Sequence, residues 1–398
     1  MIAGKKILIG VSGGIAIYKV LDLISRLKKA GAQVKVVMTE AATEFVAPIT
    51  FQTMSENVVH VEMFNQLMNM DVEHISLAKW ADLILIAPAT ANTIAKIRHG
   101  IADNLLTTVL SARVSPVAIA PAMNTKMLQN PATQENINAL KTWPGFHFLE
   151  PTSGLLACQD VGDGKMMEPV DMLDHLDAIL TEKTLAGRTV TVTAGPTQEA
   201  LDPVRYLTNH SSGKMGYALA KIARNRGAKV HLITGPTDLD YPWGILVHPV
   251  TSTQEMFDAV ASVHKETDIL IKAAAPSDFR PANFSDKKVK KRETKEMVLE
   301  LATNPDIAKH FGQLKGERIH VGFAAESHEL ETYAQGKLEE KNLDFIVANN
   351  ITQEHAGFRS DTNIVKIFYR GGEVVSLPMM TKSELAMEIL DRVQALRS

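Results

Sequence analysis

The chain has 398 residues, with 42 Lys and Arg against 45 Asp and Glu and a sequence pI near 6.5. Its length favours two domains, and its balanced charge excludes the basic surface that nucleic-acid binding needs. The single cysteine, Cys158, excludes an internal disulfide framework, and no apolar run approaches the roughly eighteen residues of a membrane span. Because the N-terminus enters a strand pattern without a charged leader, we expect a soluble, cytoplasmic protein.

The first forty residues predict a βαβ unit. An apolar strand is followed by a glycine turn and by a helix whose apolar residues Ile17, Val20, Leu21, Ile24 and Leu27 recur at helical spacing. A Gly-Ala stop and a second strand close the unit. Further on, ADLILIAPAT and SPVAIAPAM each read as a buried strand that ends in a loop of small residues.

The same plan returns after a polar break at 181–188. RTVTVTAGPT and KVHLITGP read as strands on either side of a helix, and TDILIKAAAPSD and IHVGFAAES read as further buried strands. The fold prediction is α/β, with two doubly wound, Rossmann-like domains over residues 1–186 and 187–398 and mainly parallel sheets. We expect ligands at the carboxyl ends of the strands.

Three features of the first half are candidates for function. The loop from Ser12 to Ile15 opens a helix, where backbone N–H groups could hold a phosphate or only form a tight turn, and the neighbouring loops 90–93 and 121–127 favour a ligand. His74, which we expect just before a short helix, has a purely structural alternative, as isolated histidines often do. Cys158 lies in a glycine-rich loop that suits a reactive thiol better than a buried structural one.

The second half contains LTNHSSGKMG at 207–216, which fails the P-loop pattern because Thr208 replaces the first glycine and Met215 follows Lys214. In NPDI, Asn304 is expected to cap a helix that begins at Pro305. The basic run 287–295 fits either a solvated loop or a phosphate contact.

The motifs of the first half, VSGGIAIYK, EHISLAKWAD, APATANTIAKI, PAMNTKM and the Cys158 loop, resemble the flavin-dependent cysteine decarboxylases. The resemblance implies that His74 acts as base, Asn124 binds the substrate carboxylate, and Cys158 donates a proton as reduced flavin returns hydride. Oxidation of the substrate thiol would provide the electron sink for loss of CO2. Lys79, where relatives often have arginine, and Met127 are expected to contact substrate. The implied FMN contacts are Ser12, Gly13, Gly14, Ile15, Thr39, Thr90, Ala91, Asn92, Thr93 and Ala122.

The motifs of the second half, AGPTQEALDPVRYLTNHSSGKMG, AAAPSDFRP, KVKK, NPDI and GFAAE, are similar to phosphopantothenate-cysteine ligase. The resemblance implies an acyl-cytidylate made from CTP with Mg2+, stabilised by Asn209, with Arg205 serving its cysteine-dependent turnover. Pro276 and Ser277 depart from the valine and alanine common in the family. The implied nucleotide contacts are Lys272, Ala273, Ala274, Asp278, Lys288, Pro305, Asp306, Ile307, Ala308, Phe323, Lys337 and Lys341.

Together the two halves resemble the bacterial bifunctional enzymes of coenzyme A biosynthesis, which ligate 4'-phosphopantothenate to cysteine and decarboxylate the product. We expect Ser211 and Ser212 to hold the phosphate of the pantothenate substrate. The resemblance also implies a homo-oligomer, with decarboxylase trimers, ligase dimers and often a dodecamer. The alternatives are a flavin oxidoreductase fused to a nucleotide-binding module and a flavoprotein-fold regulatory subunit.

Overall fold

The computed structural model describes residues 2–63, 72–155, 161–290, 298–326, 330–350 and 361–396. Internal contacts divide the chain into unit 1, Met1–Thr181, and unit 2, Glu182–Ser398. The division falls inside the polar break that was expected to separate the domains, slightly before residue 186. None of the described helices is long and apolar enough to cross a membrane.

Unit 1 is built on a parallel sheet of six strands. In spatial order these are β3 (Val59–His60), β2 (Gln33–Met38), β1 (Lys6–Val11), β4 (Leu83–Ala89), β5 (Val117–Pro121) and β6 (Phe146–Phe148). The strand order reverses between β1 and β4, which are neighbours in the sheet. This is the doubly wound order expected from the sequence. An antiparallel hairpin, β7 (Thr152–Leu155) and β8 (Val161–Lys165), follows the sheet.

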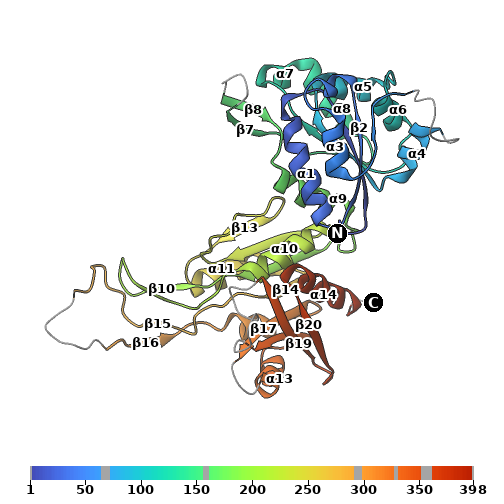
Figure 1. The fold of residues 1–398 in the computed structure, drawn as a ribbon. Coiled ribbons are helices and arrows are strands. Elements are labelled where there is room, and N and C mark those ends of the chain that lie inside the picture. The colour runs from blue at the N-terminus through green and yellow to red at the C-terminus, as the bar shows by residue number, and fades with distance from the viewer. Residues whose placement is uncertain are drawn as a thin grey trace. The chain divides into compact units, whose positions relative to one another are not determined.

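Helices cover both faces of this sheet, because the strands carry apolar side chains on both of their faces. In β1, Ile7 and Ile9 join the core beneath α1 and α9, which run side by side (Figure 1), while Leu8 joins the core of the opposite face. The helical elements are η1 (Ile15–Ile17), α1 (Tyr18–Lys29), α2 (Glu40–Thr43), α3 (Pro48–Ser55), α4 (Glu73–Trp80), α5 (Ala91–His99), α6 (Leu105–Ser111), α7 (Thr125–Gln129), α8 (Pro131–Lys141) and α9 (Pro169–Leu180).

Unit 2 repeats the plan with an eight-stranded sheet. The order is β13 (Leu246–Pro249), β12 (Lys229–Thr234), β9 (Thr189–Ala194), β14 (Ile269–Lys272), β17 (Ile319–Glu326), β18 (Phe345–Asn350), β19 (Thr362–Tyr369) and β20 (Val374–Thr381). The pairing is parallel as far as β18 and antiparallel beyond it. Two small antiparallel pairs are added, β10 (Gln198–Ala200) with β11 (Tyr206–Thr208) and β15 (Phe279–Pro281) with β16 (Leu301–Thr303).

The helices of unit 2 also divide between the faces of its sheet. One face carries α10 and α14, which contact each other (Figure 1), and the core of the opposite face includes residues of α11 and α12. The elements are α10 (Lys214–Asn225), α11 (Thr253–Val263), η2 (His264–Glu266), α12 (Ile307–Gln313), α13 (Leu330–Glu340) and α14 (Lys382–Ala395). The prediction of two Rossmann-like α/β halves is therefore confirmed.

Two local expectations need correction. The helix in NPDI begins at Ile307, and its cap is Asp306, whose carboxylate accepts a hydrogen bond from the Lys309 amide at 2.9 Å. Asn304 is engaged elsewhere, because its Nδ2 donates to the Ser277 carbonyl at 2.8 Å. His74 lies within the first turn of α4, whereas the sequence placed it just before the helix.

Gly216 permits the close approach of α10 to β9. A Cβ at this position would lie 2.5 Å from the Cβ of Ala194 and 3.1 Å from its Cα. Gly336 in α13 has no atom of another described residue within 4 Å of such a Cβ. The first glycine is therefore required by packing, and the second is not.

We expect Gly216→Ala to destabilise the protein by about 1–3 kcal/mol, because the added methyl overpacks the contact between helix and strand. Gly336→Ala is the matched control, and replacing an open helical glycine should stabilise by up to about 1 kcal/mol. Thermal unfolding of the full chain provides the comparison. Equal midpoints for the two variants would contradict the packing role of Gly216.

Candidate active sites

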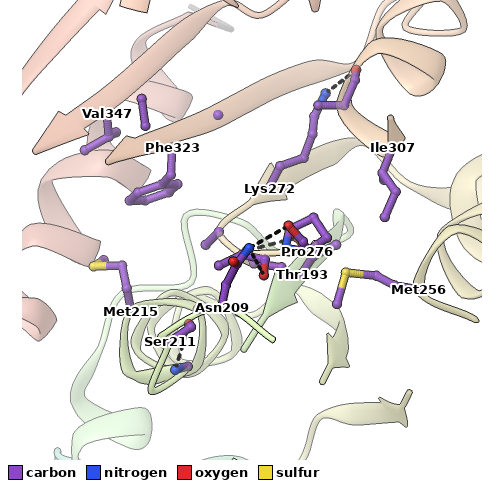
Figure 2. Close-up of a pocket in the computed structure, with 18 of the residues that line it drawn as sticks. Thr193, Asn209, Ser211, Met215, Met256, Lys272, Pro276, Ile307, Phe323 and Val347 are labelled. Atoms are coloured by element: carbon purple, nitrogen blue, oxygen red, sulfur yellow. Dashed lines mark hydrogen bonds between the residues drawn. The ribbon is translucent and has the colours of Figure 1, made fainter. Parts of the chain in front are cut away.

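A cavity of about 520 Å3 opens at the carboxyl ends of β9, β14 and β17 in unit 2. It lies where the strand order reverses, between β9 and β14, which is the usual position of a ligand in an open α/β sheet. Figure 2 shows Phe323, Val347 and Met215 on one side and Lys272, Ile307 and Met256 on the other. The cavity thus combines apolar walls with a small number of polar groups.

Most of the predicted nucleotide and substrate residues of unit 2 line this one cavity. They are Asn209, Ser211, Ser212, Lys272, Ala273, Ala274, Asp278, Pro305, Asp306, Ile307, Ala308, Phe323, Lys337 and Lys341. These residues are spread over more than 130 positions of the chain, and the parallel sheet gathers them because its strand ends share one edge.

Asn209 bridges the loop after β11 and the loop after β14. Its Nδ2 donates to the Pro276 carbonyl at 3.0 Å and to the Ala275 carbonyl at 3.4 Å (Figure 2). The amides of Ala273 and Ala274 donate to Thr193, at 3.2 and 3.3 Å. Because both amides are already bonded, the backbone at 273–274 can offer a ligand only its carbonyl oxygens.

The lining is rich in cations. Lys214, Lys272, Lys337, Lys341 and Lys382 all line the cavity, and the aspartates among its lining residues are Asp278 and Asp306. This excess of lysine favours an anionic ligand.

Ion pairs and burial limit the positive charge of three of these lysines. Lys341 forms an ion pair with Asp306, with Nζ to Oδ2 at 3.2 Å. Lys214 forms one with Asp361, with Nζ to Oδ1 at 2.6 Å. Lys382 is 8% exposed, and its pKa is lowered by burial and then by repulsion from Lys214.

Lys382 and Asn363 were missed by the sequence reasoning. Lys382 begins α14, and Asn363 lies on β19, where its Oδ1 is buried and has no hydrogen-bond partner among the described residues. Both line the cavity beside Lys214, the first residue of α10. No local motif marks them, because only tertiary packing brings α14 and β19 to this edge.

Arg205 and Lys288 do not belong to the lining described above. Arg205 pairs with Asp202, with Nη2 to Oδ2 at 2.5 Å, and donates to the Val289 carbonyl at 2.7 Å. Asp202 also accepts from the Val289 amide at 3.0 Å. The hydrogen bonds from Arg205, followed by those from backbone amides, hold the pKa of Asp202 well below its usual value.

In unit 1, hydrogen bonds connect the loops that follow the three parallel strands β1, β4 and β5. The buried hydroxyl of Ser12 donates to the Pro88 carbonyl at 2.6 Å and accepts from the Thr90 amide at 3.1 Å. Thr90 caps α5 through the Thr93 amide, and the Ala122 amide donates to the Ala89 carbonyl at 3.0 Å. Ser12, Thr90, Thr93 and Ala122 therefore lie at one sheet edge.

This edge has one tightly packed glycine, Gly13, and one buried hydroxyl without a protein partner, that of Thr39. A Cβ on Gly13 would lie 2.8 Å from the Cβ and carbonyl oxygen of Ala41, so no side chain fits there. Thr39 follows β2, and its Oγ1 is buried with no hydrogen-bond partner in the described part of unit 1. A buried hydroxyl of this kind is costly unless a ligand or water satisfies it. Gly14, Ile15, Ala91 and Asn92 occupy the same loops, and the side chain of Ile15 is 59% exposed.

Asn124 caps α7, since its side chain accepts from the Lys126 amide at 2.8 Å. The hairpin β7–β8 contacts this loop: Thr125 donates to the Asp163 carbonyl at 2.7 Å, and the Met123 amide donates to Gly164 at 3.0 Å. Strand β8 thus lies beside the Asn124 loop. Cys158 itself lies outside the described residues.

The remaining predicted substrate residues of unit 1 are spread over α4 and α7. His74 is half-buried in the first turn of α4, Lys79 is exposed in its last turn, and Met127 is exposed on α7. Among the described residues, no group of three His, Cys, Asp or Glu side chains could hold a metal ion.

Family comparisons agree with the division into two units. The family model described as Flavoprotein matches residues 1–181, and the DNA/pantothenate metabolism flavoprotein C-terminal domain matches residues 185–396. The fold and its two sites thus define a flavoprotein domain joined to a C-terminal domain of pantothenate metabolism.

Relatives with both domains give the particular family. The chain is 48% identical over 400 residues to the coenzyme A biosynthesis bifunctional protein CoaBC of Bacillus subtilis (strain 168), covering 100% of this chain and 98% of the relative. It is 42% identical over 399 residues to the protein of that name from Escherichia coli (strain K12), covering 98% and 97%. A crystal structure of a C-terminal domain of CoaBC is 41% identical, covers 54% of this chain and 98% of that chain, and has a TM-score of 0.47.

The chain belongs to this family of bifunctional coenzyme A biosynthesis proteins. It is an enzyme that combines decarboxylase and ligase activities, as the sequence predicts. The alternatives of a regulatory subunit and of an unrelated flavin oxidoreductase receive no support from these relatives.

Asp202→Asn should loosen the contact between the Arg205 turn and segment 285–290, because the amide supplies a donor where the carboxylate accepts from Arg205 and Val289. Since folding lowers this pKa, the carboxylate's stabilising effect is complete above about pH 4 and is lost in more acidic solution. At pH 8 we therefore expect trypsin to cleave after Lys287 and Lys288 several-fold faster in the variant. The exposed Asp240→Asn is the control, and equal cleavage rates would refute the link.

Proposed function

We propose that unit 2 joins 4'-phosphopantothenate to cysteine through an acyl-cytidylate made from CTP, and that unit 1 decarboxylates the product to 4'-phosphopantetheine with FMN. The observation that supports this most strongly is the lysine-lined cavity at the switch point of unit 2, in a chain of this family. The domain assignment follows the two matched halves.

Unit 2 must activate a carboxylate that resists attack by an amine. CTP would provide a cytidylyl group for this purpose: the carboxylate oxygen attacks the α-phosphorus, pyrophosphate leaves, and the cysteine amine then displaces CMP. Lys337, Lys341 and Lys288 are suited to the negative charge of the triphosphate. The carbonyl oxygens at 273–274 and the Asp278 carboxylate suit the amino donor of cytosine. A Mg2+ ion would be bound mainly by phosphate oxygens and water, and this requires no acidic cage from the protein.

Asn209 is positioned to act on the acyl group. Its contact to Ala275 is long, at 3.4 Å, so a ligand oxygen can replace that carbonyl as acceptor while the bond to Pro276 holds the amide in place. A fixed N–H donor facing a developing negative charge stabilises the transition state. Arg205 would serve the later step from its own loop, which contacts the Lys288 segment through Val289.

The 4'-phosphate of the substrate would bind at the opposite end of the cavity. Ser211 and Ser212 lie just before the twelve-residue helix α10, and Lys214 and Lys382 line the same end. The unpartnered, buried Oδ1 of Asn363 supplies an acceptor for a hydroxyl of the pantoate moiety.

The strand-end loops of unit 1 fit an FMN molecule. The supporting observation is the buried hydroxyl of Thr39, which has no hydrogen-bond partner among the described residues and lies among these loops. Gly13 packs too closely on Ala41 to carry a side chain, so its loop has only backbone to offer a ligand. Backbone donors at 13–15 and the loop 90–93 would hold the cofactor's phosphate and ring system. When bound, FMN supplies the reversible oxidation that makes loss of CO2 possible.

The chain's own residues then bind the substrate and move protons. Asn124, fixed by its cap on α7, binds the substrate carboxylate, and His74 takes the proton released on oxidation. Cys158, which precedes β8 in the chain, returns a proton to the product carbon. Lys79 and Met127 border the substrate.

We also infer a homo-oligomer, with trimers through unit 1 and dimers through unit 2. In unit 1, Ile15, Tyr18 and Ile49 are more than half exposed, which is unusual for large apolar side chains unless a partner covers them.

The two activities should separate by mutation. Full-length protein given 4'-phosphopantothenate, cysteine, CTP and Mg2+ should yield 4'-phosphopantetheine, whereas His74→Asn should stop at phosphopantothenoylcysteine because its base is lost. Asn209→Ala should reduce formation of that first product by about 100-fold, as expected when a transition-state donor is removed. Mass spectrometry of the products decides, and accumulation of the same product in both variants would refute the assignment.

Thr39→Val should change stability and flavin affinity in opposite directions. Removing an unsatisfied buried hydroxyl should stabilise the flavin-free protein by about 1 kcal/mol and weaken FMN binding. The checks are urea unfolding of the stripped protein and a fluorescence titration with FMN. Thr43→Val, whose hydroxyl already donates to the Glu40 carbonyl at 2.7 Å, is the control and should leave FMN affinity unchanged. Normal FMN affinity in Thr39→Val would show that this hydroxyl does not contact FMN.

A further inference from the structure

Lys272 is a buried amine in the wall of the nucleotide cavity. It is the last residue of β14, its side chain is 8% exposed, and it extends beneath the first turn of α12 (Figure 2). Its Nζ donates to the Ala308 carbonyl at 3.3 Å and lies 3.5 Å from Nδ1 of His320. Both neighbours are uncharged acceptors, and neither can compensate an ammonium charge.

The charged groups around Lys272 are already paired with one another. Nζ of Lys341 lies 3.2 Å from Oδ2 of Asp306, and Nζ of Lys315 lies 2.6 Å from Oδ1 of Asp344. In the described part of the chain, Lys272 forms no ion pair of its own. An ammonium at this position would therefore gain little from the two carboxylates, because each already has a lysine beside it.

The other titratable groups near Lys272 are basic. His320 on β17 and His264 on η2 are buried, with Nε2 atoms that make no hydrogen bond in the described structure. Burial and the repulsion of Lys272 lower the pKa of His320 to about 2, and burial lowers that of His264. Arg318, which donates to the His264 carbonyl at 3.1 Å, and His310 on α12 complete the surroundings. None of these groups supplies negative charge.

This environment favours the neutral amine. Burial lowers the pKa of Lys272 to about 7, and repulsion from Lys341 adds to the effect. At pH 8 most of the protein without nucleotide therefore carries an uncharged side chain at position 272.

We propose that Lys272 takes up a proton when a nucleoside triphosphate enters the cavity, so that this cation of the binding site exists only in the complex. The inference rests on the proposed use of a nucleotide by unit 2. Lys272 lines the same cavity as Lys337 and Lys341, and the phosphates bring the negative charge that its surroundings lack. The proton comes from solvent, and the bond to Ala308 is kept.

Thermodynamic linkage fixes the sign of the effect. If nucleotide raises the pKa of Lys272, protonation and binding favour each other, and each unit of pKa corresponds to a tenfold change in affinity. Affinity should then fall as the pH rises above about 7, and the fall continues until the pH passes the pKa of the complex.

The test is titration calorimetry of full-length protein with CTP and Mg2+, without pantothenate substrate or cysteine, in buffers of different ionisation enthalpy. At pH 8, where the triphosphate itself is fully ionised, we expect uptake of more than about half a proton per CTP bound. Between pH 7 and pH 9 the affinity should fall roughly tenfold.

Three variants test the residue assignment. Lys272→Met should bind CTP about tenfold more weakly at pH 7, without proton uptake or pH dependence, because no amine remains. Lys272→Arg is always charged, so it should keep the affinity and lose the proton uptake. Lys337→Met removes a partly exposed lysine of the same cavity and should weaken binding while proton uptake persists.

The outcomes separate the two claims. Binding of CTP without proton uptake at pH 8, or uptake that persists in Lys272→Arg, overturns the role of Lys272 and leaves the proposed ligase function intact. Failure to bind CTP at all overturns the nucleotide assignment and this inference with it. If Lys272→Met does not fold, the wild-type pH profile and Lys272→Arg still decide.

Discussion

Parallel strand pairing at the switch point is the constraint on which both sites depend. In unit 2, β9 pairs in parallel with β12 and with β14, and in unit 1, β1 pairs in parallel with β2 and with β4. Helices bury both faces of such sheets, so polar side chains are left to the edges. The helices must also approach closely enough to enclose a site, as Gly216 allows for α10.

The two units use the same edge for different chemistry. Unit 1 lines its strand ends with hydroxyls and small residues such as Ser12, Thr39 and Thr90, where we propose that FMN binds. Unit 2 lines its own with lysines, which a polyphosphate needs. The fold therefore does not determine the reaction, and the side chains at the strand ends do.

Sequence reasoning succeeded where the information is local. Strand periodicity predicted β1, β4 and β14. The family resemblance supplied most of the fourteen expected residues that line one cavity, and their roles stay predictions. It failed where several local candidates compete, since Asn304 and Asp306 are both capable helix caps and only the tertiary bond of Asn304 to Ser277 decides between them. It also missed Lys382 and Asn363, because packing of α14 and β19 brings them to the cavity from outside any motif.

The five lysines that line the cavity would repel one another if every side chain were charged and unpaired. Two devices limit this repulsion: Asp306 and Asp361 pair with Lys341 and Lys214, and burial lowers the pKa values of Lys272 and Lys382. The empty site thus carries less positive charge than its composition indicates. An arriving polyanion reverses the balance, because its charge favours the protonated form of each buried amine. Positive charge therefore accumulates in the site as the ligand binds, and the folded protein avoids the strain of holding it beforehand.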